Sequence, residues 1–270
     1  MARETSAGRG RSLTPRARRR LGAVESGELL PRLAESRVGR VLEPLARLQS
    51  RSAQLSFVEE VTKILAHAFA YAEAERVAGD YAEFGVWEGR TFVEAYRVAQ
   101  RFPAFPRRFV AFDSFVGLPD LGEVDAGGQF FAGQFDHDPR AFEARLRRAR
   151  IPPERVTIVE GFFAETLGHP ERIPLDEVAV AFVDCDLYAS TVPVLDYLTP
   201  KLAQGAVLIF DDWYCFQGAP DRGERRACGE WLERNPQISL VPWRQHSWGG
   251  QGFLVRLDEG AGADTSTPSR

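Results

Sequence analysis

Runs of residues that are apolar at every position alternate along this chain with segments of helical periodicity. The runs FVAFD at 109–113 and VAVAFVD at 178–184 carry no polar side chain before their last residue. A strand with one face in water would alternate apolar and polar residues, so both runs predict strands that are buried on both faces. Strands of this kind alternate with helices in parallel sheets that carry helices on each face. The sequence therefore predicts an α/β fold.

Seven segments fit strands of one mostly parallel sheet whose last strand is antiparallel. The expected strands cover residues 81–85, 109–113, 156–159, 178–184, 206–210, 238–241 and 252–257. Helices are expected over 57–78, from the first strand through Arg101, and over 140–150, 192–203 and 222–234. Gly205 is expected to end the helix before it, because glycine commonly follows a helix C-terminus. This pattern predicts one α/β domain over residues 79–258.

The two ends of the chain differ in composition from this domain. Residues 1–25 are expected to form a disordered basic arm, residues 26–78 a helical segment, and residues 259–270 a disordered tail. The formal net charge is −4, but the first twenty residues hold seven arginines and one glutamate, which leaves −10 for the rest. An acidic domain argues against a nucleic-acid-binding surface.

No membrane-spanning or secretion segment is expected. The sequence contains no run of about 18 apolar residues, and its first residues lack the apolar stretch of a secretion signal. The three cysteines, Cys185, Cys215 and Cys228, do not have the spacing of a metal site. The composition therefore indicates a cytoplasmic protein with reduced thiols and no membrane partner.

Four of the expected strands end in acidic residues. The first ends in Glu83, the second in Asp113, the fourth in Asp184-Cys185-Asp186 and the fifth in Asp211-Asp212. The carboxyl ends of parallel strands meet at one edge of a sheet, where ligands of such folds bind. Capping of the following helix would explain any one of these acids. Four together repel one another, and they predict a cation or a hydroxyl-rich ligand at this edge.

The first strand turns into a helix through Glu83-x-Gly85-x-x-x-Gly89. Glycines at such a turn let the backbone approach a ligand closely. The motif is not the dinucleotide fingerprint, because Trp87 takes its middle glycine position, and no phosphate-binding lysine follows. An acidic loop would repel a pyrophosphate and suits a cationic ligand. With Asp113 placed to bind ribose hydroxyls, these residues predict a positively charged nucleoside.

Asp184, Asp211 and Asp212 follow two strands that are separated by one helix, and we expect them to lie close together. Carboxylate oxygens are ligands that magnesium prefers, so these residues predict a magnesium site. A bound cation can hold a substrate hydroxyl and lower its pKa. Helix capping stays open as the alternative reading of these aspartates.

Five segments together resemble the macrocin and mycinamicin type of sugar O-methyltransferases. They are EFGVWEGRT (83–91), FVAFDSFVGLPD (109–120), VEGFFAETL (159–167), FVDCDLYAST (182–191) and LIFDDW (208–213). The resemblance covers about residues 55–257. It implies a class I methyltransferase fold with a Rossmann-like sheet, S-adenosylmethionine (AdoMet) as methyl donor, magnesium as cofactor, and a deoxysugar hydroxyl of a natural product as acceptor.

The resemblance also assigns residues to the two cofactors. The AdoMet motifs contain Glu83, Gly85, Gly89, Thr91, Asp113 and Ser114, and Glu160, Gly161 and Phe162 would lie beside the adenine. Asp184, Asp211 and Asp212 correspond to the metal ligands. Asp184, His137 and His246 are the candidates for the base that takes the hydroxyl proton. Aromatic residues near the same edge, Trp213, Tyr214, Phe216, Trp243 and Trp248, could pack on a sugar or on the core.

Other functions stay open at this point. A metal-dependent methyltransferase of a catechol-like phenol would share the same motifs. A protein that binds AdoMet without catalysis and a nicotinamide dehydrogenase are further alternatives. A nucleic-acid methyltransferase is disfavoured, because the only Asn-Pro pair, at 235–236, ends a helix. The acceptor is expected to be a small hydroxylated molecule, and assembly into a homo-oligomer stays open.

Overall fold

The structure is a computed structural model that describes residues 57–103 and 108–258. The expected arm at 1–25, the helical segment up to residue 56 and the tail at 259–270 lie outside the described residues. No helix in the described ranges is long and apolar enough to cross a membrane.

The described chain forms one seven-stranded sheet in the order β3-β2-β1-β4-β5-β7-β6. The strands β1 to β5 are parallel, and β7 is antiparallel to both of its neighbours. The strands are β1 Asp80–Phe84, β2 Phe109–Asp113, β3 Val156–Glu160, β4 Val178–Val183, β5 Leu202–Phe210, β6 Ile238–His246 and β7 Gly250–Leu257. The predicted fold class is confirmed.

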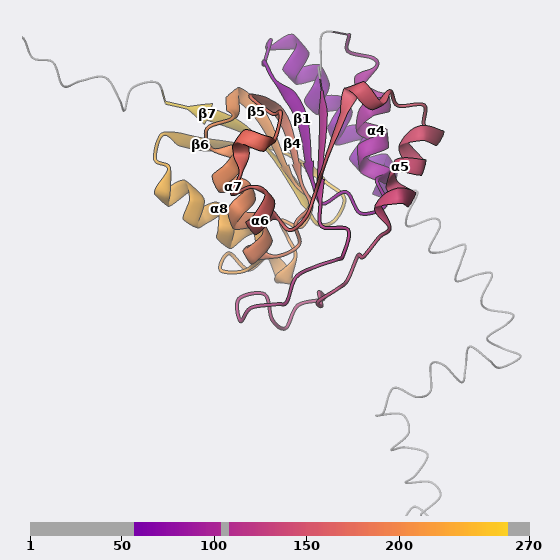
Figure 1. The fold of residues 1–270 in the computed structure, drawn as a ribbon. Helices are drawn as coiled ribbons and strands as arrows, with labels where there is room; N and C mark the ends of the chain where they lie inside the picture. Colours follow the sequence, from indigo (N-terminus) through magenta and orange to yellow (C-terminus); the bar gives the residue numbers. More distant parts are fainter. Residues whose placement is uncertain (1–56, 104–107, 259–270) are drawn as a thin grey trace, which may run out of the picture. The chain divides into compact units, whose positions relative to one another are not determined.

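Helices cover both faces of this sheet. Figure 1 shows α4 and α5 on one face and α6, α7 and α8 on the other. They are α4 Arg90–Ala99, α5 Pro139–Arg148, α6 Phe163–Thr166, α7 Tyr188–Leu198 and α8 Gly223–Arg234, with short 3₁₀ turns η1 Pro153–Arg155, η2 Pro170–Arg172 and η3 Phe216–Gly218. A further helix covers residues 57–74. Its Phe69 packs on Tyr81 of β1, with ring centroids 5.7 Å apart.

The sheet is held by the apolar runs that predicted it. Every residue of β1, β2 and β4 is buried, as expected for strands that are covered on both faces. Phe84 of β1 and Phe112 of β2 stack with ring centroids 4.4 Å apart, and Tyr197 of α7 packs edge-on against both. The central strands therefore form a rigid base, which fixes the positions of the residues that follow their carboxyl ends.

One predicted helix is wrong at both ends. The helix expected over 192–203 is α7, which begins at Tyr188 and ends at Leu198, and Gly205 lies inside β5. The start was missed because its first amides are capped by a carboxylate far away in sequence, that of Asp125. Gly205 has a φ of 81° at a point where the register between β4 and β5 shifts. Its left-handed conformation serves this irregularity of the strand and does not end the helix.

The final hairpin is longer than the sequence predicts. The strand expected over 238–241 extends to His246, and its partner begins at Gly250. The pattern is broken at Pro242, which has no N–H to donate, and the register shifts between Pro242 and Arg244. His246, one of the candidate bases, is therefore a strand residue.

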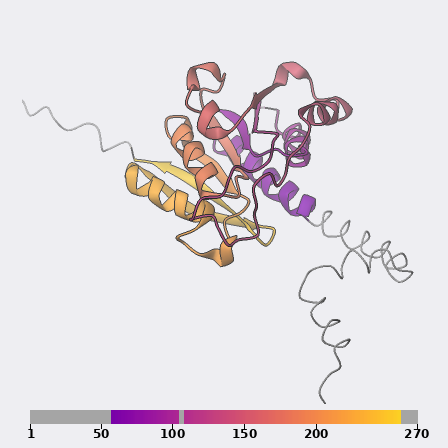
Figure 2. The same ribbon diagram turned by 60° about the horizontal axis from the view of Figure 1, so that its bottom comes forward.

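The connection between β2 and α5, residues 114–138, lies at the carboxyl ends of the strands. It hangs below the sheet in Figure 1, and in Figure 2, where this end comes forward, it lies across the strand ends. Phe130 of this connection packs with Leu187 and Cys215 in a second, small apolar cluster. The connection therefore has its own packing and covers the edge at which ligands of such folds bind.

Gly85 allows β1 and β4 to end in close contact. Its φ is 89°, and a Cβ atom there would lie 1.9 Å from the carbonyl oxygen of Asp184. The amide of Asp184 donates to the carbonyl of Phe84 at 2.9 Å, so the two strand ends are joined at this point. A side chain at position 85 would push them apart.

We expect Gly85→Ala to lower the free energy of unfolding by about 2 kcal/mol or more, through left-handed strain and the backbone overlap. Urea denaturation measures this change. The matched control is Gly122→Ala, since no atom lies within 4 Å of a Cβ at Gly122. Equal stability of the two variants would contradict the close contact between the strand ends.

Candidate active site

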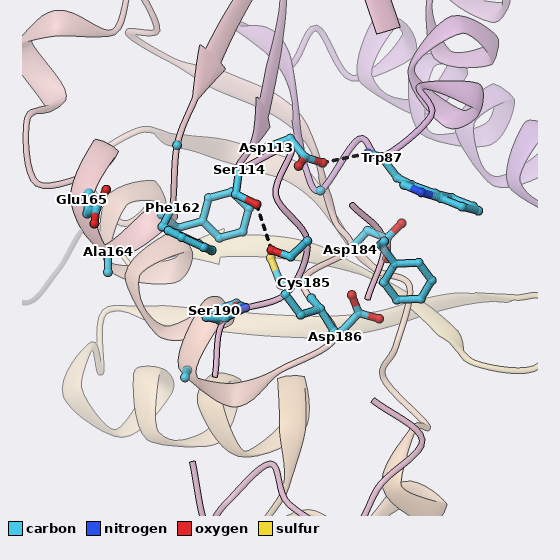
Figure 3. A pocket seen from close by; sticks show the side chains of 18 of the residues that line it. Trp87, Asp113, Ser114, Phe162, Ala164, Glu165, Asp184, Cys185, Asp186 and Ser190 are labelled. Carbon is cyan, nitrogen blue, oxygen red and sulfur yellow. Dashed lines mark hydrogen bonds between the residues drawn. The ribbon is translucent and has the colours of Figure 1, made fainter. Parts of the chain in front are cut away.

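A pocket of about 390 Å³ opens at the carboxyl ends of β1 to β4, a size typical of small-molecule sites. Its walls come from the segments that follow these four strands. They are Gly85 and Trp87 after β1; Asp113, Ser114, Gly117, Leu118, Pro119, Asp120 and Phe135 after β2; Gly161–Glu165 after β3; and Asp184–Asp186, Ala189 and Ser190 after β4. Figure 3 shows Asp184 and Asp186 on the side of the pocket opposite Phe162 and Glu165.

Five of the residues predicted to bind the cofactor line this pocket, and four do not. Gly85, Asp113, Ser114, Gly161 and Phe162 belong to its walls. The predicted residues outside the walls are Glu83, Gly89, Thr91 and Glu160. Their binding roles stay predictions, but the structure gives two of them a different local task.

Glu83 lies in the middle of the sheet and is fully buried. Its Oε2 accepts a hydrogen bond of 2.5 Å from the hydroxyl of Tyr81. Burial raises the pKa of the Glu83 carboxyl well above its usual range. Gly89, the second of the two, has a φ of 76°, and a Cβ there would lie 2.4 Å from the ring of Phe142. It lets the start of α4 pack closely on α5.

Asp113 lines the pocket and holds two of its loops. Its Oδ2 accepts hydrogen bonds from the amides of Val86 and Trp87 at 2.8 and 2.7 Å, and its Oδ1 accepts one from Phe115 at 2.7 Å. Figure 3 shows the bond to Trp87. The carboxylate thus fixes the turn after β1 against the turn after β2. About one acceptor position is left on its oxygens, because a carboxylate offers about four.

Three carboxylates gather beside the pocket. One ligand oxygen each of Asp184, Asp186 and Asp212 lies within 4.8 Å of the others. Asp184 and Asp212 belong to the predicted metal set, whereas Asp186 does not. Asp211, the third predicted ligand, is instead paired with His246, whose Nε2 lies 2.8 Å from its Oδ1.

The electrostatics of this acidic cluster fit a cation. Burial and the neighbouring carboxylates raise the pKa of Asp184 and of Asp186 well above the usual range, and burial raises the pKa of Asp212 to about 6. Oδ2 of Asp212 is buried and has no hydrogen-bond partner among the described residues. A divalent cation would neutralise the charges and use such free oxygens as ligands.

Asp186 could have been found from its spacing. It stands two residues after Asp184 at the end of the same predicted strand, in the motif Asp184-Cys185-Asp186. Asp186 has a φ of 61°, which is uncommon for a residue other than glycine. Strained backbone of this kind concentrates at functional sites.

The two candidate histidines lie in different environments. His246 is 2% exposed, and a Cβ at Gly250 would lie 2.0 Å from its ring, so Gly250 leaves space for the imidazole. His137 is half-buried in the 114–138 connection, outside the pocket walls. Neither imidazole is part of the pocket lining, whereas Asp184 is.

The tryptophans expected near this edge also differ in their packing and exposure. Trp213 packs on Phe210 and Phe253, and Trp243 packs on Tyr71. Trp248, in the turn between β6 and β7, is 70% exposed. Of the three tryptophans, only Trp248 presents a free ring.

Asp125 is a site residue that the sequence reading missed. It is 1% exposed, and its carboxylate accepts hydrogen bonds from the amides of Tyr188 at 2.7 Å and Ala189 at 3.3 Å. It thereby caps α7 from the 114–138 connection and fixes this wall of the pocket to the helix that follows Asp186. No sequence signal marks this contact, because Tyr188 and Ala189 lie 63 and 64 residues after Asp125 in the chain.

Comparisons with known proteins show to which proteins this chain is similar. A relative from Streptomyces olivaceus, the 8-demethyl-8-(2,3-dimethoxy-alpha-L-rhamnosyl)-tetracenomycin-C 4'-O-methyltransferase, is 30% identical over 146 residues, which is 52% of this chain. The match spans about half of that relative's length, 55%. The mycinamicin III 3''-O-methyltransferase of Micromonospora griseorubida is 25% identical over 79% of this chain and 76% of its own.

A solved structure is similar over nearly the whole chain. The calicheamicin methyltransferase CalS11 matches with a TM-score of 0.57 and 25% identity, over 95% of this chain and 100% of its own. The family model described as macrocin-O-methyltransferase (TylF) matches residues 59–225, more than half of the chain. The chain belongs to the macrocin O-methyltransferase (TylF) family.

Proposed function

We propose that this protein is an AdoMet-dependent, divalent-cation-dependent O-methyltransferase that acts on a sugar hydroxyl of a natural product. The observation that carries the proposal is that Asp184 and Asp186 belong both to the pocket walls and to the acidic cluster. A ligand in the pocket and a cation on the cluster would therefore share an edge. That arrangement is what methyl transfer to a cation-held hydroxyl requires.

The pocket suits a cationic nucleoside. Phe162 offers an apolar wall, and the carboxylates of Asp184 and Asp186 lie on the opposite side. A nucleobase packs well on aromatic and apolar surface, whereas a sulfonium is attracted to carboxylates. Asp113 and Ser114 lie between them at the end of β2, where they would meet the ribose.

The chain's own residues supply positioning and a proton acceptor. A magnesium ion on Asp184, Asp186 and Asp212 would hold the acceptor hydroxyl and lower its pKa. Bound AdoMet would supply the methyl group: the hydroxyl oxygen would form the new bond to the methyl carbon, the sulfur would keep the electron pair of the bond that breaks, and the proton would pass to a base. Asp184 and Asp186 border both the pocket and the cluster, so one of them takes that proton.

The acceptor class follows from the relatives. The tetracenomycin relative is named for methylation of a rhamnosyl group, and the mycinamicin relative for a 3''-hydroxyl. The exposed ring of Trp248 offers a surface on which the C–H face of a sugar can pack. A hydroxylated small molecule from natural-product biosynthesis is therefore the proposed substrate.

Methyl transfer tests the proposal directly. AdoMet with a labelled methyl group is incubated with a panel of deoxysugar glycosides and catechol-like phenols, in chelator and with magnesium. We expect label in a sugar product with magnesium, and none in chelator. AdoMet should also raise the melting temperature, and NAD should not. Undiminished transfer in chelator would contradict the cation, and transfer to phenols alone would contradict the acceptor.

Removing one carboxylate from the cluster should stabilise the cation-free protein. The Asp212 carboxylate lies beside those of Asp184 and Asp186, and burial raises its pKa to about 6, so the surroundings disfavour its charged form when no cation is bound. We expect Asp212→Asn to raise the free energy of unfolding in chelator by about 1 kcal/mol, yet to abolish turnover. Urea denaturation with and without magnesium measures both states. A variant less stable than wild type in chelator would contradict mutual repulsion.

Asp113 should control donor binding through the loops that it holds. We expect Asp113→Ala to weaken AdoMet affinity at least tenfold and to lower stability by about 2 kcal/mol, because buried amides lose their acceptor. Calorimetric titration and urea denaturation measure these changes. Asp136→Ala is the control, since Asp136 is exposed and outside the pocket walls. If the Asp113→Ala variant binds AdoMet with wild-type affinity, Asp113 does not control donor binding.

A further inference from the structure

Glu224, in the first turn of α8, is a buried carboxylate that lies next to the acidic cluster without joining it. Its side chain is 1% exposed, and it lines no part of the pocket. Carboxylates are almost never fully buried without partners, so its contacts need an explanation.

Both carboxylate oxygens of Glu224 accept hydrogen bonds from main-chain amides. Oε1 accepts from the amide of Cys185 at 3.3 Å, and Oε2 accepts from the amide of Asp212 at 3.1 Å. Cys185 lies between Asp184 and Asp186 in the segment after β4, and Asp212 follows β5. One side chain therefore joins the two segments that carry all three aspartates of the cluster.

The start of α8 is built to bring Glu224 to this place. Gly223 has a φ of 51°, and a Cβ there would lie 2.8 Å from the ring of Phe216 and 3.6 Å from the carbonyl oxygen of Asp186. The glycine lets the helix begin directly against the backbone of the cluster. A carboxylate in the first turn is also favoured by the unpaired amides at a helix N-terminus.

We propose that Glu224 is a positioning residue of the cation site, which fixes the segments carrying Asp184, Asp186 and Asp212 at the spacing that a divalent cation needs. This inference rests on the proposed cation dependence. Residues behind metal ligands hold them in orientation, and their loss typically weakens metal affinity 10–100-fold. A fourth carboxylate beside three others costs stability without a cation, and a bound cation would offset that cost.

The test is the affinity of the full-length protein for Mn²⁺, followed by the paramagnetic resonance of free Mn²⁺, without acceptor or turnover. Glu224→Gln keeps the shape of the side chain but turns an N–H group toward one of the two amides. We expect its Mn²⁺ dissociation constant to rise at least tenfold, while its AdoMet dissociation constant stays within twofold of wild type. In chelator its melting temperature should not fall below that of wild type.

Glu230→Gln is the matched control on the same helix. Glu230 also has two partners, Tyr188 and Arg226, but neither belongs to the cluster. We expect wild-type Mn²⁺ affinity for this variant. Glu224→Asp distinguishes the effect of the carboxylate's position from that of its charge, because it keeps the charge on a shorter side chain. We expect it to lose Mn²⁺ affinity as well.

Each other result overturns a stated claim. If Glu224→Gln binds Mn²⁺ with wild-type affinity, the positioning role is overturned and the proposed function stays intact. The same holds if Glu224→Gln loses Mn²⁺ affinity and Glu224→Asp does not. If the melting temperature of Glu224→Gln falls by the same amount with and without Mn²⁺, Glu224 is a purely structural residue. Absence of Mn²⁺ binding by the wild-type protein would overturn the cation site itself, and this inference with it.

Discussion

Mutual repulsion among buried carboxylates is the constraint on which the rest of this site depends. Asp184, Asp186 and Asp212 bring a ligand oxygen each to within 4.8 Å of one another. Such charges separate unless the backbone beneath them is held. The apolar strands β4 and β5 provide part of that support, because both are anchored in a core that is closely packed on both faces. The remaining support comes from hydrogen bonds at the strand ends.

Three further carboxylates bind main-chain amides of the loops around the pocket. Asp113 joins the turns after β1 and β2, Asp125 joins the 114–138 connection to α7, and Glu224 joins the segments after β4 and β5. A carboxylate suits this task, because it offers several acceptor positions to amides that have no partner in a helix or strand. Asp113 also lines the pocket, whereas Asp125 and Glu224 lie outside its walls and act through the segments that they hold.

The sequence predicts the sheet and the positions of some of the acidic residues at its edge. The apolar runs predict β2 and β4 closely, and strand ends predict where Asp184 and Asp212 lie, because periodicity and strand order act locally. Asp125 and Glu224 could not be predicted. The partners of Asp125 lie 63 and 64 residues away and those of Glu224 lie 39 and 12 residues away, and nothing in the local pattern distinguishes the two acids from surface acids. The start of α7 was missed for the same reason, since its cap is Asp125 and not a neighbour in sequence.

The aspartates that follow β4 and β5 differ in whether they reach the cluster. Asp184 and Asp186 both follow β4 and both reach it, with Asp186 in a left-handed conformation at a φ of 61°. Asp211 and Asp212 are adjacent, so they diverge: Asp212 joins the cluster, and Asp211 meets His246 at 2.8 Å. That histidine occupies space that a side chain at Gly250 would fill. A doublet of acids after a strand thus supplies one carboxylate to the cluster and one to an internal pair, whereas an acid-x-acid spacing supplies two.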